Sequence, residues 1–300
     1  MSSGSFRRSR KSICSDGSNA AVSLQPGGLL AKVTALNVTP KTVEVASAGN
    51  LEPKHLKMLL SCLQTSINPD EKCRILITLG NASAFTVNQN LIREYDGLSI
   101  IAGFLFDPST NVRVQTLNTL NNLSMNIPNQ ERLTLYVPKV LELIETSPVN
   151  SELQLCALRL LTNLSVCDKN QHLLKESLKL LLTLFVVSNE PAQVQTLKVL
   201  VNLSSNPDMM DDIVQVQAPA SLLLLFDPRT SPAVLVRLLI FAGNLKAWRP
   251  SALVADDLRH KQDCLYRLML DECSQLHSRV LPLLSHPDEE VRLQATRVFT

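Results

Sequence analysis

Asparagine side chains recur along this sequence at nearly constant intervals, and their amides could form hydrogen bonds with an extended peptide. Asn81, Asn122, Asn163 and Asn202 each stand near the end of a leucine-rich segment, and a degenerate copy surrounds Asn244. Successive members are separated by 41, 41, 39 and 42 residues. Stacked units would align these amides in a row, which we call the asparagine ladder. An amide has donors and an acceptor, so the ladder could bind a peptide backbone, satisfy carbonyls of the adjacent unit, or do both.

Side chains that commonly bind metals or act in catalysis form no recognised motif. The seven cysteines include no C-x-x-C pair, and the nearest approach to a zinc site, His260, Cys264, Cys273 and His277, has the spacing of no common motif. Phosphate-binding, dinucleotide-binding, zinc-protease and nucleophile-elbow patterns do not occur. We therefore predict no metal, no cofactor and no catalytic residues. An enzyme whose pocket is assembled from residues distant in sequence is the alternative of another class.

Basic residues near the N-terminus are candidates for a targeting role. Arg7, Arg8, Arg10 and Lys11 precede the first acidic residue, Asp16, and no apolar segment of a signal peptide follows them. Such a run is typical of a solvated tail. It is also compatible with a nuclear signal, a mitochondrial targeting element or a basic segment beside a membrane.

Composition favours helices and argues against nucleic acid as the partner. The chain has 300 residues, of which 45% are hydrophobic and 4% aromatic, with only 9 glycines. A leucine-rich, glycine-poor sequence is typical of long helices rather than strands. The formal net charge is +2 and basic residues are mixed with acidic ones, so we expect no nucleic acid partner. The most apolar run, 180–187, is far shorter than the ~20 residues that span a bilayer, so no transmembrane segment is expected.

The ladder asparagines must be positioned by helices, and the surrounding sequence indicates three helices in each unit. Apolar residues before each asparagine recur at helical spacing, as in Val114, Leu117 and Leu120. A turn rich in Asp, Pro, Ser or Asn precedes this longest helix, and another apolar helix precedes the turn. A short polar helix begins near a repeated Asn-Gln pair and completes the unit. The second helices are expected at 97–106, 137–145, 178–187 and 218–226.

The length of the unit and its three helices indicate the architecture. A repeat of about 40 residues is typical of armadillo units when it holds three helices and of HEAT units when it holds two. We predict an all-α fold, an armadillo-type right-handed α-solenoid of about six three-helix repeats over residues 51–300. An irregular insertion is expected at about 248–270, where the period is interrupted. Residues 1–50 are predicted to be a disordered, basic and serine-rich tail.

The residues of the first repeats resemble those of one family. The segments 77–81, 84–89, 92–94 and 117–124 are similar to those of the X-linked armadillo-repeat protein family. The similarity runs from about residue 51 to the end of the chain and is weaker after Trp248. It implies a non-enzymatic protein-binding adaptor on the cytosolic face of the mitochondrial outer membrane. The implied role is mitochondrial dynamics, distribution and transport, with proteins of that machinery as partners and some forms in the nucleus.

The N-terminus departs from the pattern of that family. Its members typically begin with a hydrophobic anchor followed by basic residues, whereas here the basic run 7–11 stands without the anchor. Two alternatives follow. Either the start is truncated or alternatively spliced, which leaves membrane association open, or this form is a soluble nuclear or cytosolic regulator that binds a protein peptide in the solenoid groove.

A comparison with importin-α-like receptors limits the class of partner. Those receptors resemble the asparagine motif but carry tryptophans one helical turn before it. The matching positions here are Ile77, Asn118, Arg159 and Lys198. Lysine side chains of a nuclear signal would find no aromatic cage at such positions. A nuclear-import receptor is therefore disfavoured.

Overall fold

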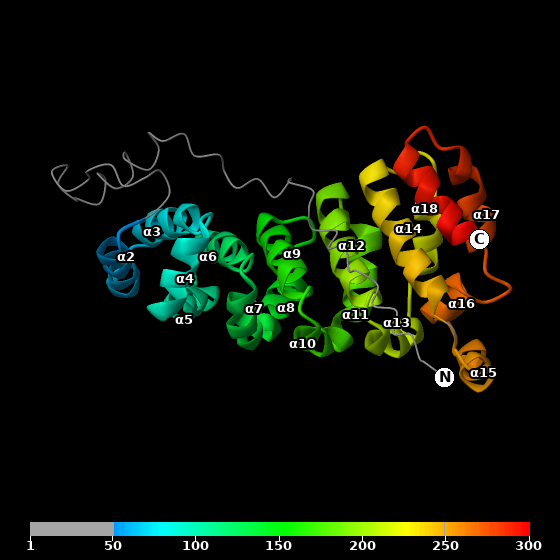
Figure 1. The fold of residues 1–300 in the computed structure, drawn as a ribbon, viewed down its shortest axis with the longest axis horizontal. Coiled ribbons are helices and arrows are strands. Elements are labelled where there is room, and N and C mark those ends of the chain that lie inside the picture. The colour runs from blue at the N-terminus through cyan, green and yellow to red at the C-terminus, as the bar shows by residue number, and fades with distance from the viewer. Residues whose placement is uncertain (1–50, 249) are drawn as a thin grey trace, which may run out of the picture.

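The long helices of the chain stand side by side in an elongated row (Figure 1). The computed structural model describes residues 51–248 and 250–300. Each repeat ends with its longest helix, the third helix, which packs against the third helix of the next repeat. This arrangement confirms the predicted all-α solenoid. The third helices are α3 (Pro69–Ala82), α6 (Thr110–Leu123), α9 (Glu152–Leu164), α12 (Glu190–Ser204), α14 (Pro232–Ala247) and α18 (Glu289–Phe299).

The predicted disordered tail, residues 1–50, lies outside the described residues. The targeting candidates Arg7, Arg8, Arg10 and Lys11 lie there as well. Their proposed role therefore stays a prediction from the sequence.

Shorter helices precede each third helix. The second helices are α2 (Pro53–Thr65), α5 (Gly97–Gly103) with the 3-10 turn η2 (Phe104–Phe106), α8 (Val137–Thr146), α11 (Leu178–Val187), η6 (Ala220–Leu225), and α17 (Leu276–Val280) with η7 (Leu281–Ser285). The first helices are α4 (Thr86–Glu94), α7 (Ile127–Leu133), α10 (Asp168–Gln171), α13 (Met210–Gln215) and α16 (Leu265–Met269). Short 3-10 turns extend three of these first helices: η3 (Thr134–Tyr136), η4 (His172–Ser177) and η5 (Pro207–Met209).

The segment expected as an irregular insertion contains two short helices. The helix α15 (Ala252–His260) packs against α16, and α16 packs against α13 and η6 of the fifth repeat. Backbone hydrogen bonds fix this junction, from Leu265 N to Val216 O (2.8 Å) and from Ala218 N to Asp263 O (2.9 Å). We therefore assign α16 as the first helix of the last repeat. The helix α15 is an additional helix that makes this repeat longer than the others.

Four of the six third helices, α3, α9, α12 and α18, begin after a polar side chain that accepts hydrogen bonds from the first free backbone amides. Asn68 precedes α3, and its Oδ1 accepts hydrogen bonds from the amides of Asp70 (2.8 Å) and Glu71 (3.4 Å). Ser151 at α9 and Asp288 at α18 cap their helices in the same way. Such caps typically contribute about 1 kcal/mol each. The polar turns that mark these repeats in the sequence are therefore the start signals of their third helices.

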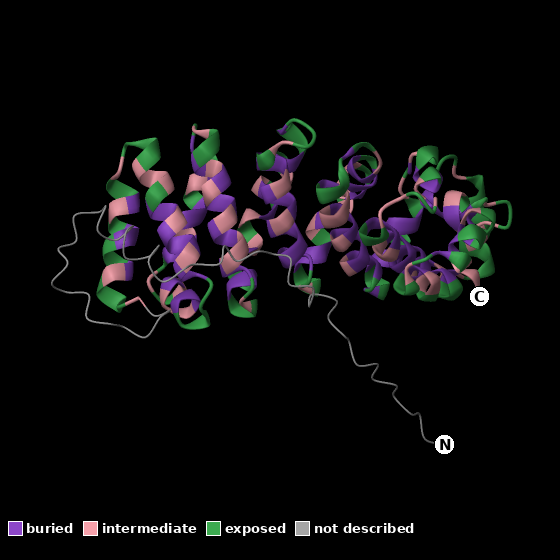
Figure 2. Ribbon diagram, turned by 90° about the horizontal axis from the view of Figure 1, so that it is seen from above, coloured by how far each residue is buried: buried purple, intermediate pink, exposed green. Residues whose placement is uncertain are grey.

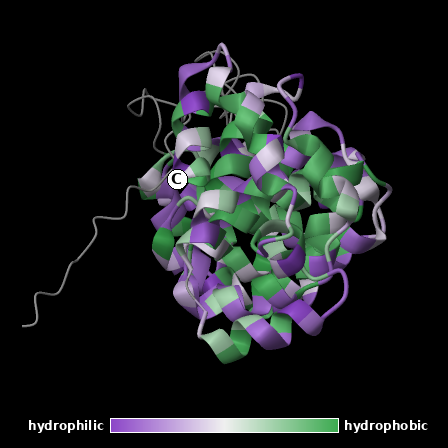
Figure 3. Cartoon of the chain, turned by 90° about the vertical axis from the view of Figure 1, so that its right-hand side faces the viewer, coloured by the Kyte–Doolittle hydropathy of each residue, from purple (hydrophilic) through white to green (hydrophobic). Residues whose placement is uncertain are grey.

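The core runs along the row without interruption. Leucine side chains of each third helix, such as Leu117, Leu120 and Leu123, are fully buried. Figure 2 shows buried residues where neighbouring helices face one another and exposed residues at the outer turns. Viewed from the end, hydrophobic residues gather inside the row and hydrophilic ones around it (Figure 3). Because each repeat completes the burial of its apolar side against its neighbours, the position of every third helix depends on the next.

Candidate functional site

The ladder asparagines connect each third helix to the one before it. Asn122 Nδ2 donates to Gly80 O at 2.9 Å, and Asn163 Nδ2 donates to Asn121 O at 3.1 Å. Asn202 Nδ2 likewise donates to Thr162 O at 3.2 Å. Each donor reaches back about forty residues to the preceding repeat. One of the two roles considered from the sequence, the bonding of these amides to carbonyls of the adjacent repeat, is therefore present in the structure.

Serine hydroxyls at the ends of the third helices strengthen this connection. Asn163 Nδ2 lies 3.0 Å from Ser124 Oγ, and Asn202 Nδ2 lies 2.9 Å from Ser165 Oγ. The degenerate copy follows the same pattern, because Asn244 Nδ2 donates to a serine hydroxyl of the preceding repeat at 3.1 Å. The ladder therefore continues into α14.

Asn81 opens the ladder and differs from the later members. Its Nδ2 atom is buried and has no hydrogen-bond partner among the described residues. In that part of the chain no third helix precedes α3 to offer a carbonyl. Its helix packs closely on the next third helix, α6, because a Cβ atom on Gly80 would lie only 3.1 Å from Thr119 Oγ1. Asn81 thus has the position of a ladder residue without the bond that the others form.

The acceptor atoms of the central ladder residues remain available. Within the described part of the chain, no donor reaches the Oδ1 atoms of Asn122, Asn163 or Asn202, and none of these atoms belongs to the buried atoms without a partner. An amide oxygen that solvent reaches can accept a hydrogen bond from a peptide N–H. The second alternative, peptide binding, is therefore chemically open while the donors hold the repeats together.

Two rows of side chains lie beside the asparagines on the same side of each third helix. A position four residues before each asparagine is one helical turn away, and a position seven residues before is two turns away. Most of these side chains are at least partly exposed. We call the two rows, with the asparagines, the ladder track. One turn before stand Ile77, Asn118, Arg159, Lys198 and Ile240, and two turns before stand Arg74, Gln115, Cys156, Gln195 and Arg237.

A buried thiol fixes one polar side chain of the track. Cys156 Sγ donates to Asn118 Oδ1 at 3.2 Å. Burial raises the pKa of Cys156 to about 11, and the nearby positive charge of Arg159 only partly opposes this effect. The thiol therefore stays protonated at neutral pH and acts as a hydrogen-bond donor rather than as a nucleophile.

The Asn-Gln pairs have a structural role that the sequence pattern did not identify. Asn129 Nδ2 donates to Leu123 O at 3.0 Å, and Gln130 Nε2 donates to Ser124 O at 2.8 Å. The pairs at 88–89 and 170–171 form the same two bonds, each to a residue six positions earlier. These carbonyls end a third helix and have no partner within it. Each Asn-Gln pair follows its ladder asparagine at the same distance in the sequence, and this constant spacing was the signal that could have revealed that the pairs cap the third helices.

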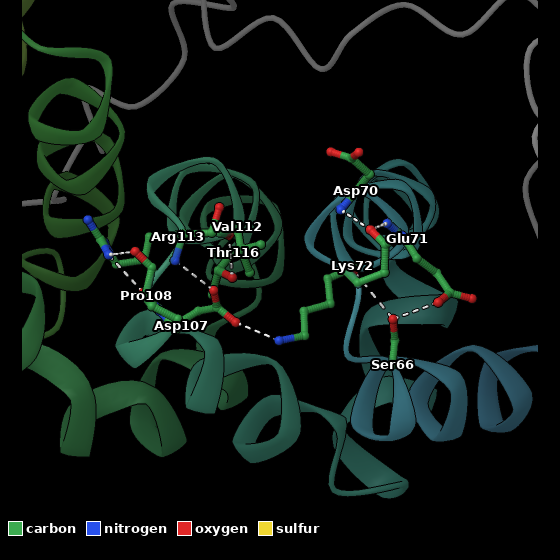
Figure 4. A network of polar contacts seen from close by, with 11 residues as sticks. Ser66, Asp70, Glu71, Lys72, Asp107, Pro108, Val112, Arg113 and Thr116 are labelled. Atoms are coloured by element: carbon green, nitrogen blue, oxygen red, sulfur yellow. Dashed lines mark hydrogen bonds and ion pairs between the residues drawn. The ribbon is translucent and has the colours of Figure 1, made fainter.

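A polar network ties the first two repeats together at the start of their third helices (Figure 4). Lys72 Nζ lies 2.8 Å from Asp107 Oδ2, and the Asp107 side chain is only 4% exposed. Arg113 Nη1 donates to the carbonyls of Asp107 (2.7 Å) and Pro108 (3.1 Å). Asp107 is thus contacted from both sides and holds α3 and α6 in register.

The described residues offer neither an evident metal site nor a spanning helix. Among residues 51–248 and 250–300, no three His, Cys, Asp or Glu side chains gather closely enough to hold a metal ion. None of the described helices combines the length and apolar character that crossing a membrane requires.

Comparison with known proteins supports the repeat architecture. A family model described as Armadillo-like matches residues 51–270. A designed armadillo repeat protein solved in complex with the peptide (KR)4 is 17% identical, with a TM-score of 0.67 over 82% of this chain and 99% of that chain. A computationally designed armadillo repeat protein for modular peptide recognition is 18% identical, with a TM-score of 0.68 over 81% of this chain and 98% of that chain. At these identities the likeness concerns the fold.

Proposed function

We propose, from the premise that this chain belongs to the armadillo-like family, that it is a protein-binding adaptor that holds an extended segment of a partner along the ladder track. The armadillo solenoid is typically a non-enzymatic scaffold for protein binding. Of the structurally similar designed proteins, one was solved in complex with the peptide (KR)4 and another was designed for modular peptide recognition. The observation that carries the proposal is the row of Oδ1 atoms on Asn122, Asn163 and Asn202, which accept no hydrogen bond from the described residues.

The geometry of the ladder suits an extended chain. Neighbouring packed helices lie about 8–10 Å apart. An extended peptide rises about 3.3 Å per residue, so about three residues pass each repeat. One backbone N–H of the peptide can then reach the Oδ1 atom of each repeat. The Nδ2 atoms already bonded to the preceding repeat hold the acceptors in place before the peptide arrives, which lowers the entropy lost on binding.

Binding is tested with linear peptides selected by display on the full chain, with affinities measured by fluorescence anisotropy. We expect Asn122→Ala to weaken a selected peptide by about 5- to 10-fold, because one hydrogen bond is worth about 1 kcal/mol. Asn129→Ala is the matched control, since it removes a buried amide bond to a helix end that lies off the track. Equal affinities for Asn122→Ala and the wild type, or failure to select any linear peptide, would argue against the proposal.

We also propose that the adaptor acts at the cytosolic face of the mitochondrial outer membrane, in mitochondrial dynamics, distribution and transport. This part is supported by the resemblance of the repeats to X-linked armadillo-repeat proteins and by the basic run Arg7, Arg8, Arg10 and Lys11. A soluble nuclear or cytosolic regulator that binds through the same track is the alternative.

Imaging distinguishes the two locations. The full chain and a variant that lacks residues 1–50 are each expressed in cells with a C-terminal tag. Both are imaged together with mitochondrial and nuclear markers. A mitochondrial signal that is lost on deletion supports targeting by the basic run. A diffuse or nuclear signal from both forms supports the soluble alternative and moves the search for partners away from the membrane.

A further inference from the structure

The two rows beside the asparagines carry positive charge and no carboxylate. Arg159 and Lys198 stand one turn before their asparagines, and Arg74 and Arg237 stand two turns before theirs. The remaining positions of both rows are amide, thiol or aliphatic side chains. The balanced net charge of the whole chain hides this local excess.

The positive charge of the track is not fully neutralised within the chain. Neither the guanidinium group of Arg74 nor that of Arg159 forms a hydrogen bond or an ion pair with any described residue, in contrast to the ammonium group of Lys72, which is paired with Asp107. The nearest carboxylates on these helices lie in their first turns, at Asp70 and Glu71 in α3 and at Glu152 in α9. They border the track on the side away from the asparagines, so a peptide beside the ladder lies nearer to the cations.

We propose that the segment bound along the track is acidic, with Asp or Glu side chains directed at Arg159 and Lys198 while its backbone donates to the ladder asparagines. This inference rests on the proposed function and specifies its partner. Cations one repeat apart are about 10 Å from each other, which is the rise of three extended residues. An acidic run therefore places one carboxylate over each cation. Guanidinium and carboxylate groups also pair with favourable geometry.

A protein segment fits these rows better than a nucleic acid does. Proteins that bind single strands combine cations with aromatic side chains on which bases stack. None of the residues named above for the two rows is aromatic, and the central ones are Asn118, Arg159 and Lys198. Amide acceptors match peptide N–H groups, whereas a phosphate backbone offers no such donors.

The test compares labelled (Asp-Glu)4 and (Lys-Arg)4 peptides by fluorescence anisotropy on the full chain at two salt concentrations. We expect (Asp-Glu)4 to bind at least about tenfold more tightly at low salt, with a preference that shrinks as salt rises, because exposed charges are screened. The double variant Arg159→Glu with Lys198→Glu should lose this preference. Lys169→Glu with Lys175→Glu makes the same change in net charge outside the third helices and should keep it.

The outcomes separate this inference from the proposed function. Equal or tighter binding of (Lys-Arg)4 by the wild type, or the same loss in both double variants, overturns the acidic assignment. If display-selected peptides depend on Asn122 while neither octapeptide binds, the adaptor function stands and the charge inference fails. Displacement of (Asp-Glu)4 by a lower concentration of oligouridylate would assign the cations to nucleic acid instead. Circular dichroism of each variant shows whether it is folded.

Discussion

At the scale of single residues, the amide of a central ladder asparagine has a donor and an acceptor whose effects can be separated. The Nδ2 donor of Asn122 satisfies the carbonyl of Gly80 in the preceding repeat, and its Oδ1 atom, which accepts no hydrogen bond from the described residues, is the acceptor that we propose for a partner segment. Asn81 differs, because its Nδ2 atom has no partner in the described part of the chain. A buried donor without a partner lowers stability, whereas a paired one raises it. The same residue type should therefore respond to substitution in opposite ways.

We expect Asn122→Ala to lower the free energy of unfolding by about 1–3 kcal/mol, because the buried carbonyl of Gly80 loses its donor. Asn81→Ala should change it by less than about 0.5 kcal/mol, or raise it slightly, since no bond is lost. Urea denaturation followed by circular dichroism measures both. A larger loss for Asn81→Ala than for Asn122→Ala would show that the ladder does not connect the repeats as described.

The Cys156 thiol provides a second test at this scale. Burial raises its pKa to about 11, so the reactive thiolate is rare below that pH. We expect iodoacetamide at pH 8 to modify the exposed Cys273 and to leave Cys156 unmodified, with modification of Cys156 rising only as the pH approaches 11. Peptide mass spectrometry after timed alkylation measures this. Rapid modification of Cys156 at pH 8 in the folded chain would contradict the buried hydrogen bond to Asn118.

At the scale of elements, polar contacts hold the third helices in place at both ends. The Asn-Gln pairs cap their final carbonyls, and the Lys72–Asp107 pair links α3 and α6 at their first turns. The cap bonds lie in buried positions where water cannot replace them. Removing one partner of a buried pair leaves an uncompensated charge, whereas exposed pairs contribute little.

We expect Lys72→Ala to destabilise the chain by about 3 kcal/mol, because it leaves the carboxylate of Asp107 buried without its cation. The control is Lys169→Ala, which breaks the exposed pair with Glu131 and should cost less than about 1 kcal/mol. Thermal unfolding midpoints of the two variants measure the difference. Similar midpoints would mean that Asp107 is solvated or satisfied by its other contacts.

Periodicity in the sequence was enough to predict the repeats but not all of their contacts. The second helices expected at 97–106 and 178–187 have those bounds in the structure, because leucine spacing and Asp-Pro turns are local signals. The second helix expected at 218–226 is a short 3-10 turn, η6. Pro219 precedes it and Ala218 is tied to Asp263 from the inserted segment, a contact that no local pattern contains. The partners of the Asn-Gln pairs likewise depend on how helices meet in space.

At the scale of the whole molecule, the solenoid converts a short local motif into a long surface. Stacking places the open amide acceptors of Asn122, Asn163 and Asn202 in a row along α6, α9 and α12, with up to one cation per repeat beside them along α3, α9, α12 and α14. Affinity along such a surface grows with the number of repeats that a segment contacts, because each adds a small independent term. The central repeats, with Arg159 and Lys198, should therefore determine which partner is chosen.

The central claim, that a partner segment lies along the ladder track, is tested most directly by site-specific photo-cross-linking. A photoreactive phenylalanine analogue replaces Asn118 on the track. As the control it replaces Leu135, a residue that is 83% exposed in η3 outside the track. Each full-length variant is irradiated with a display-selected peptide. We predict a covalent adduct from position 118 and none from position 135. An adduct from position 135 alone, or from neither position although the peptide binds, would contradict this account.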